Sequence, residues 1–134
     1  MKLILDTCAI IWAVADEKRI PRVCADVLTA PETRIYISPI SAAEIACACD
    51  RGRLVLDRHL KRWLHHFLDL NGWETLPIDL DIMEEAYSLP GKFHADPADR
   101  IIVATARRRE LVVVTGDTKI LSYPHVSILW DQKL

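Results

Sequence analysis

The chain has 134 residues, 17 Lys and Arg against 19 Asp and Glu, and a formal net charge of −2. A chain of this length with 51% hydrophobic and 27% charged residues excludes collagen-like, low-complexity and largely disordered classes, and it needs no disulfide or structural metal to fold. A net charge near zero excludes a histone-like polycation, so any contact with nucleic acid must come from a local basic patch.

Short β-branched apolar runs alternate with stretches of helical period along the chain, which predicts an α/β domain with a mostly parallel sheet. Five strands are expected at residues 2–5, 34–38, 74–77, 111–115 and 126–129, the third being weak because it is short and ends in proline. Helices are expected at about 7–15, 21–29, 41–51, 57–70, 80–88 and 97–109. No repeat or linker interrupts the pattern, so we expect a single domain over residues 1–134.

The fourth expected helix is strongly amphipathic. Its apolar face indicates packing or dimerisation, and the opposite face is expected to be solvated. The apolar face consists of Leu56, Leu60, Trp63, Leu64, Phe67 and Leu68, and the polar face of Arg58, His59, Lys61, Arg62, His65 and His66.

Membrane insertion and export are both disfavoured. The longest apolar run, 8–15, has eight residues, whereas a membrane-spanning helix needs about 20. Lys2 and the small residues at 13–15 imitate the ends of a signal peptide, but Asp6 interrupts the apolar stretch, which leaves export as the less favoured alternative. No C-x-x-C pair is present, so we expect buried cysteine side chains and a reducing, cytoplasmic compartment.

Acidic residues mark one edge of the expected sheet. In a parallel α/β sheet the carboxyl ends of the strands and the amino ends of the helices meet at this edge, where ligands bind. Four acids map there: Asp6, Glu44, Asp99 and Asp117.

Each of these acids also has a purely structural interpretation. Ser41 and Glu44 have the spacing of a capping box. Asp96, Pro97 and Asp99 suit the first turn of a helix, where the helix dipole favours negative charge. Asp117 follows Gly116 as in a simple turn, whereas Asp6 lies between apolar runs and is harder to explain this way.

Several carboxylates at one edge require a compensating charge. Two of them about 4 Å apart repel by roughly 4 kcal/mol at an effective dielectric constant of 20. Oxygen donors without converging His or Cys favour Mg²⁺ or Mn²⁺ over Zn²⁺. Such ions held over a phosphodiester activate water and stabilise the leaving oxygen, which is the chemistry of a nuclease.

Four motifs in order resemble the PIN-domain ribonucleases, specifically the VapC toxins of prokaryotic toxin–antitoxin pairs, and together they cover essentially the whole chain. They are Leu3-Ile4-Leu5-Asp6-Thr7, Ser41-x-x-Glu44, Phe93-His94-x-Asp96-Pro97-x-Asp99-Arg100 and Val113-Val114-Thr115-x-Asp117.

The resemblance implies a three-layer α/β/α fold with strand order 3-2-1-4-5 and hydrolysis of RNA that depends on Mg²⁺ or Mn²⁺. It also implies homodimerisation and inhibition by a cognate antitoxin protein. Asp6, Glu44, Asp99 and Asp117 match the four acidic positions of the family. Asp6 and Asp99 are the firmest metal ligands, and Asp96 is a close rival for Asp99. The family places supporting hydroxyls at Thr7, Ser41 and Thr115.

The chain departs from the family's pattern at Cys8, Ala95 and Ala98, which affects only the lining of the substrate pocket. His94 is expected to be a hydrogen-bonded structural residue rather than a catalytic one. Trp12 is expected to pack rather than stack on a base. The run at 107–109 is expected to be solvated at the opposite edge, so the cations expected to contact RNA are Arg51, Arg53, Lys92 and Arg100.

Three other functions are compatible with parts of this pattern. A receiver-like signalling domain also gathers acids at this edge, but Pro77 and Trp130 stand where it needs an Asp and a Lys. A binding module in which the acids only cap helices would be independent of metal. A PIN-type nuclease that processes RNA without an antitoxin is the third alternative.

Overall fold

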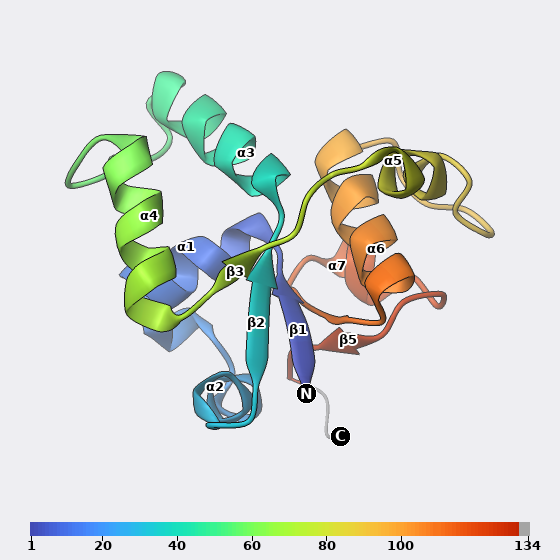
Figure 1. Cartoon of the computed structure of the whole chain (residues 1–134), viewed down its shortest axis with the longest axis horizontal. Helices are drawn as coiled ribbons and strands as arrows, with labels where there is room; N and C mark the ends of the chain where they lie inside the picture. Colours follow the sequence, from blue (N-terminus) through green and yellow to red (C-terminus); the bar gives the residue numbers. More distant parts are fainter. Residues whose placement is uncertain (132–134) are drawn as a thin grey trace.

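A computed structural model describes residues 1–131 (Figure 1). Its strands form one wholly parallel sheet in the order β3-β2-β1-β4-β5, as expected. Strand β1 is central, with Leu3 opposite Ile35 on one side and Val112 on the other. The strands are β1 (Lys2–Leu5), β2 (Arg34–Ile37), β3 (Glu74–Thr75), β4 (Val112–Val114) and β5 (Ile128–Leu129).

Helices cover both faces of the sheet. Alternate residues of β1 point to opposite faces and pack into separate clusters. Leu3 and Leu5 pack into one apolar cluster with α1 (Thr7–Ala15), α2 (Arg22–Thr29), α3 (Pro39–Asp50) and α4 (Leu60–Asn71). Ile4 packs into a second cluster with α6 (Pro97–Arg109) and α7 (Thr118–Leu121). Helix α5 (Leu80–Ala86) packs against α6. The three-layer α/β/α architecture is therefore confirmed.

The predicted elements agree with the structure best where a cap fixes their ends. Helices α1 and α6 have the predicted bounds and are capped by Asp6 and Asp96. Strand β3 has two residues and β5 has two, so the predicted third and fifth strands were too long. The short helices η1 (Glu17–Arg19) and α7 were not predicted.

The predicted capping box at Ser41 and Glu44 is wrong. Helix α3 begins two residues earlier, at Pro39, and its N-cap is Ser38, whose Oγ accepts a hydrogen bond from the amide of Ile40 at 3.2 Å. Proline suits the first helical position because its fixed φ is already helical and it has no amide hydrogen to satisfy. Ser41 is instead buried inside the helix, and Glu44 is free to point elsewhere.

Helix α4 begins at Leu60, three residues later than expected, and its apolar face packs as predicted. Trp63 is buried in the first cluster, where Leu60, Leu64 and Phe67 join it. Trp12 also packs there, with its ring 5.6 Å from that of Trp130. Across residues 1–131, no helix combines the length and apolar character needed to cross a bilayer.

Candidate metal and catalytic site

Asp6 lies at the carboxyl end of β1 and is only 5% exposed. As the N-cap of α1 it accepts a hydrogen bond from the amide of Ala9 through Oδ1, at 2.7 Å. Its Oδ2 accepts from the hydroxyl of Thr115 at 2.5 Å. The carboxylate is thus fixed by an amide of α1 and by a hydroxyl that directly follows the neighbouring strand β4.

Glu44 reaches the same edge from α3. The hydroxyl of Thr7, the first residue of α1, donates to Glu44 Oε1. Oγ1 of Thr7 also lies 2.9 Å from Oγ of Ser41, one turn before Glu44. Together Thr7 and Ser41 link the start of α1 to the side of α3, which holds the Glu44 carboxylate beside the end of β1.

The start of α6 contributes two more acids with different environments. Asp96 is the N-cap, and its Oδ1 accepts from the amides of Ala98 at 2.9 Å and Asp99 at 3.3 Å. Asp99 is in the first turn, and its Oδ2 lies 2.6 Å from Nε2 of His94. Asp99 is therefore held by a side chain from outside its helix, whereas Asp96 is tied to its own helix.

Asp117 follows β4 and caps α7, accepting from the amide of Lys119 at 2.9 Å. Its own amide donates to the hydroxyl of Thr115 at 3.0 Å. Thr115 therefore joins Asp117 to Asp6. The intervening Gly116 lies against the ring of Trp130, so closely that a Cβ there would stand 2.8 Å from two ring atoms.

The structure brings these acids into one electrostatic cluster. The pKa of Asp6 is raised to about 6, chiefly by burial; the hydrogen bonds from Thr115 and Ala9 lower it, and the charges of Asp99 and Asp117 raise it. Burial likewise raises the pKa of Glu44 and of Asp99, and in each case Asp96 adds repulsion. Acids from four separate segments therefore lie close enough for their charges to act on Asp6, Glu44 and Asp99.

Cys8 lies beside this cluster, in agreement with its expected place in the lining of the pocket. The pKa of its thiol is raised to about 11, first by partial desolvation of the sulfur and then by the negative charges of four acids: Asp6, Glu44, Asp117 and Asp99. The thiol is thus a neutral group on the rim of the acidic site. Cys24 is buried as expected, but Cys8 and Cys47 are exposed, so the expectation of four buried cysteines was wrong.

The donor chemistry of this cluster fits a hard divalent cation. Its members offer carboxylate oxygens, and a cation would offset both the burial of negative charge and the repulsion that raise the pKa values of Asp6, Glu44 and Asp99. Within residues 1–131, no three Asp, Glu, His or Cys side chains already stand in the arrangement of a complete metal site. The carboxylates therefore lie at one edge of the sheet but do not surround a single metal position.

Arg100 is not available to RNA, contrary to expectation. Its Nε donates to the carbonyl of His94 at 3.0 Å, Nη1 to that of Ala86 at 2.9 Å, and Nη2 to that of Phe93 at 2.9 Å. The guanidinium therefore ties the segment before α6 to the end of α5. The acceptors are backbone carbonyls of the preceding loop and of the end of α5, and a pattern of side chains does not reveal backbone acceptors.

The other expected cations line two grooves beside the acids. Arg51 and Arg53 line a groove of about 510 Å³ whose wall includes Glu44 and Asp96. On the other side, Lys92 and Lys119 line a groove of about 400 Å³ with His94. Basic side chains therefore flank the acidic cluster from two directions.

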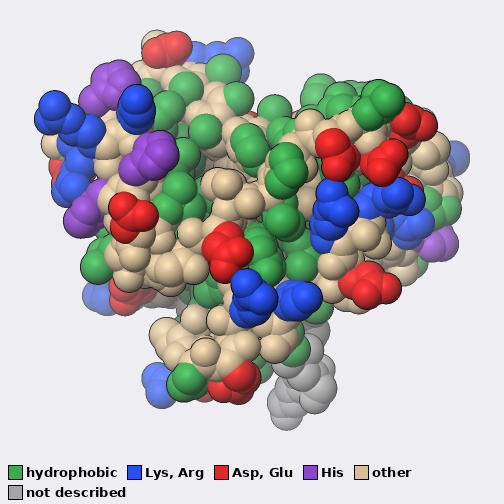
Figure 2. Space-filling view, viewed as in Figure 1, with side chains coloured by type: hydrophobic (Ala, Val, Ile, Leu, Met, Phe, Trp, Pro, Cys, Tyr) green, Lys and Arg blue, Asp and Glu red, His purple; other side chains and the backbone are tan. Residues whose placement is uncertain are grey.

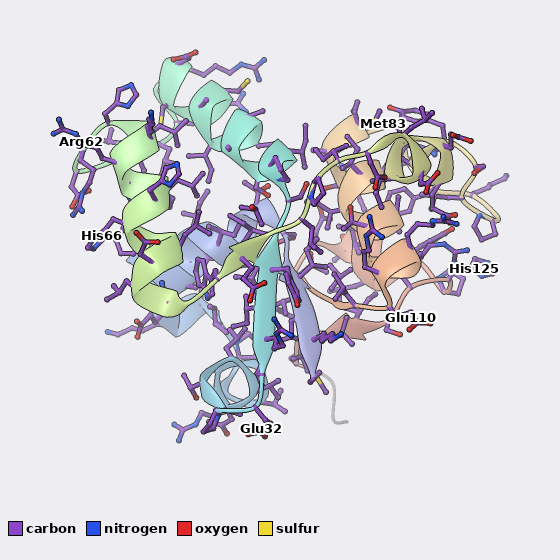
Figure 3. All side chains as sticks on the ribbon, viewed as in Figure 1. Glu32, Arg62, His66, Met83, Glu110 and His125 are labelled. Atoms are coloured by element: carbon purple, nitrogen blue, oxygen red, sulfur yellow. The ribbon has the colours of Figure 1, made fainter. Side chains whose placement is uncertain are left out.

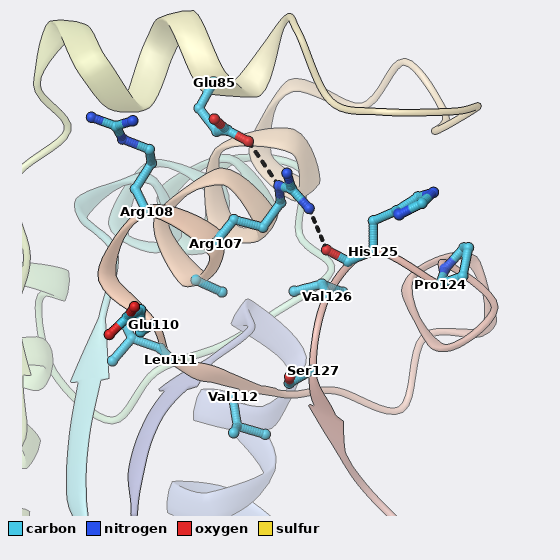
Figure 4. A pocket seen from close by; sticks show the side chains of 11 residues that line it. Glu85, Arg107, Arg108, Glu110, Leu111, Val112, Pro124, His125, Val126 and Ser127 are labelled. Atoms are coloured by element: carbon cyan, nitrogen blue, oxygen red, sulfur yellow. Dashed lines mark hydrogen bonds and ion pairs between the residues drawn. The ribbon is translucent and has the colours of Figure 1, made fainter.

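A cavity of about 780 Å³ lies away from the acidic cluster, where α6 ends and β4 begins (Figure 4). Arg107 spans its wall, donating to Glu85 at 2.7 Å and to the carbonyl of His125 at 2.6 Å. Arg108 and Arg109 pair with Asp81 and Asp79 of the α5 region. Arg108 and Arg109 are exposed, as expected of a solvated run, whereas Arg107 is partly buried. Each of the three also pairs with an acid of α5 or of its N-cap, which was not predicted.

Comparisons with known proteins agree with this arrangement. The chain is 27% identical over 123 residues to Ribonuclease VapC22 of Mycobacterium tuberculosis, covering 92% of both proteins. The fold matches VapBC2 of Rickettsia felis bound to a promoter DNA fragment, with a TM-score of 0.72, 18% identity, and 96% and 98% of the chains covered.

A second solved structure, DNA-bound VapBC of Salmonella typhimurium, matches with a TM-score of 0.70 and 21% identity over 96% of this chain and 97% of that one. These identities show the fold alone. The family model of the PIN domain, however, matches residues 3–126, which include every acid of the cluster. With its 3-2-1-4-5 sheet and the acids gathered at the carboxyl edge, this chain belongs to the PIN domain family.

Proposed function

We propose that this protein is a metal-dependent endoribonuclease that hydrolyses RNA phosphodiester bonds and acts as the toxin of a toxin–antitoxin pair. The observation that carries the proposal is the cluster of acids with raised pKa values at the carboxyl edge of the sheet. A relative named as a ribonuclease covers 92% of the chain and supports the same activity.

We assign the metal ligands to Asp6, Asp99 and Asp117, with Asp96 as an alternative to Asp99. Asp6 and Asp117 are held at fixed positions by the shared Thr115 hydroxyl. A bound Mg²⁺ or Mn²⁺ supplies charge to stabilise the leaving oxygen and lowers the pKa of a water. Either ion suits a site built of oxygen donors.

Glu44 is assigned to accept a proton from the attacking water. Its raised pKa favours this role, because an ideal catalytic base has a pKa close to the working pH. Thr7 donates to one carboxylate oxygen, which leaves the other for the water. Thr7, Ser41 and Thr115 act as positioning residues, since they orient acids rather than touch the reacting atoms.

The RNA backbone is proposed to lie in the two flanking grooves. We propose that Arg51 and Arg53 bind phosphates in one groove and that Lys92 and Lys119 bind phosphates in the other, which the lining of the two grooves supports. Such contacts are needed because the acidic cluster itself repels a polyanion. Specificity within RNA would then come from base contacts beyond these cations.

The partners belong to the same proposal. Structural neighbours that are toxin–antitoxin complexes support inhibition by a protein antitoxin in the cytoplasm. A homodimer is supported by the outer face of α5, where Leu80 is 73% and Tyr87 is 59% exposed, with Met83 between them. Figure 2 shows this apolar surface over α5, at the upper right.

Cleavage of a mixed pool of structured and unstructured RNA tests the activity. Wild-type protein is assayed with Mg²⁺, with Mn²⁺ and with EDTA, beside Asp6→Asn prepared identically to exclude contaminating nucleases. Cleavage that needs metal and disappears in the variant supports the nuclease. Because Asp6, Asp96 and Asp117 all cap helices, absence of cleavage in every condition would favour the binding module.

A further inference from the structure

The charge of this chain is distributed unevenly. Residues 51–66 contain five Lys and Arg and a single acid, Asp57, for a local charge of 5 − 1 = +4. Because the whole chain carries −2, the remaining residues carry −2 − 4 = −6. The same segment also holds three of the five histidines. A concentrated basic segment in an acidic protein is a local attraction for polyanions.

The segment connects the groove beside the acids to the outer face of α4. Arg51 and Arg53 line that groove together with Ala48 of α3. The C-terminal half of α3 also forms a wall of a second hollow, of about 480 Å³, which Arg58 and His59 line from the other side. The basic side chains thus continue past α3 onto α4.

The outer face of α4 presents the end of this strip to solvent. Lys61, Arg62, His65 and His66 are exposed, and Figure 3 shows Arg62 and His66 directed away from the body of the molecule. Figure 2 shows Lys, Arg and His side chains gathered over this helix, at the upper left. Helical spacing of three and four residues places them side by side.

Lys61 and Arg62, the Lys and Arg side chains of this face, have no acidic partner among the described residues. Arg58 is paired with Asp57 at 2.9 Å, but no salt bridge joins Lys61 or Arg62 to a carboxylate within residues 1–131. Asp69 is the exposed acid of α4, and it lies two turns after Lys61. The inner face of the helix is meanwhile fixed in the core by Trp63.

We propose that residues 51–66 form a second RNA-binding surface, which we call the α4 strip, and that it binds the phosphate backbone several nucleotides from the scissile bond. This inference rests on the proposed function. Charge complementarity favours RNA as the occupant, because the strip begins in the groove that the substrate is proposed to occupy and carries unpaired cations where α4 faces solvent. It gives long RNA an attachment that short RNA cannot reach.

Binding of fluorescent single-stranded RNA in EDTA tests the strip without requiring cleavage. The variant Lys61→Ala with Arg62→Ala is compared with wild type on RNA of about 30 and about 6 nucleotides, lengths above and near the span of one small binding site. The control is Lys18→Ala with Arg22→Ala, which removes the same charge from exposed positions outside the strip.

We expect the α4 variant to bind long RNA about 10-fold more weakly near 100 mM salt, and its salt dependence to be shallower by about 1.4 in log–log slope, since each phosphate contact to a single strand contributes about 0.7. Short RNA should bind equally to both proteins. An equal loss with the control variant, or with short RNA, would overturn the proposal. So would retained RNA binding with lost binding to anionic vesicles or to an acidic peptide.

This design separates the two proposals. If wild type cleaves no RNA with Mg²⁺ or Mn²⁺ but the α4 variant still loses long-RNA binding in EDTA, then the nuclease fails and the strip stands. If cleavage is metal-dependent and the α4 variant binds and cleaves long RNA as wild type does, then the strip fails and the nuclease stands.

Discussion

Nε2 of His94 lies 2.6 Å from Oδ2 of Asp99, and both side chains are largely shielded from solvent. His94 belongs to the segment before α6. Arg100 holds this segment against the end of α5 by donating hydrogen bonds to three backbone carbonyls. It opposes the burial that raises the pKa of Asp99, because hydrogen bonding to a carboxylate favours its charged form. His94 thus prepares Asp99 to bind a cation.

Replacing His94 with Ala should therefore raise the Mg²⁺ concentration for half-maximal cleavage by about 10-fold, the range typical for the loss of a residue that orients a metal ligand. The maximal rate at saturating metal should fall less. A Mg²⁺ titration of cleavage measures both, with His125→Ala as a control in the cavity at the far edge. An unchanged metal requirement would contradict this role.

Asp6→Asn should abolish cleavage and stabilise the metal-free fold. The amide keeps the shape of the side chain and removes a charge that burial disfavours, and a shift from 3.8 to about 6 corresponds to a gain of up to about 3 kcal/mol at pH 8. Urea unfolding in EDTA measures the free energy. A variant less stable than wild type at pH 8 would mean that the hydrogen bonds of the charged form dominate.

The same residue predicts how stability depends on pH. The folded pKa of Asp6, about 6, lies above its ordinary value of 3.8, so the folded state holds the extra proton between these values. The stabilisation of the folded state by this proton is fully present below about pH 4 and is lost as the pH rises through about 6. In EDTA the unfolding free energy of wild type should therefore decline over this range more steeply than that of Asp6→Asn. Parallel profiles would contradict the assignment.

Gly116→Ala should destabilise the fold by about 1 to 3 kcal/mol, because its Cβ would stand 2.8 Å from the ring of Trp130. The strain falls one residue before Asp117, so cleavage should fall as well. A double-mutant cycle with Trp130→Leu checks the cause: the two costs should be less than additive if the ring is the obstacle.

Glu110→Gly should stabilise the protein by about 1 kcal/mol. Glu110 ends α6 with φ of 57°, and it is the one residue other than glycine with positive φ among those described. This left-handed conformation costs side-chain-bearing residues about 1–2 kcal/mol. Gly72 ends α4 in the same conformation, with φ of 66°, so Gly72→Ala is the reciprocal control and should lower the melting temperature.

The sequence predicted the parts of the site whose signals are local. A carboxylate directly after a buried strand, as at Asp6, lies at the edge of the sheet irrespective of how the rest of the chain is arranged. Pro97 likewise fixes the start of α6 and hence Asp99. The partners of Arg100, Arg107 and His94 were not predictable, because they come from turns and helices brought near only by tertiary packing.

The shortest elements were not predicted correctly, for a related reason. Strand β5 has two residues and α7 has four, too few to show a period of two or of 3.6. The predicted start of α3 was wrong because Ser38 and Ser41 are both suitable N-caps. Ser38 is the cap in the structure because a proline follows it. Competing local signals of similar strength need the folded context to decide between them.

Three aspartates of the acidic cluster also cap helices, which has a consequence for how the protein can be inactivated in nature. Asp6, Asp96 and Asp117 each hold helix amides with an oxygen that asparagine also carries. An exchange to asparagine, which a single nucleotide change produces, would remove charge from the site and leave the helix starts intact. A population selected against the nuclease should therefore accumulate folded, silent copies of this chain that still occupy its binding partners.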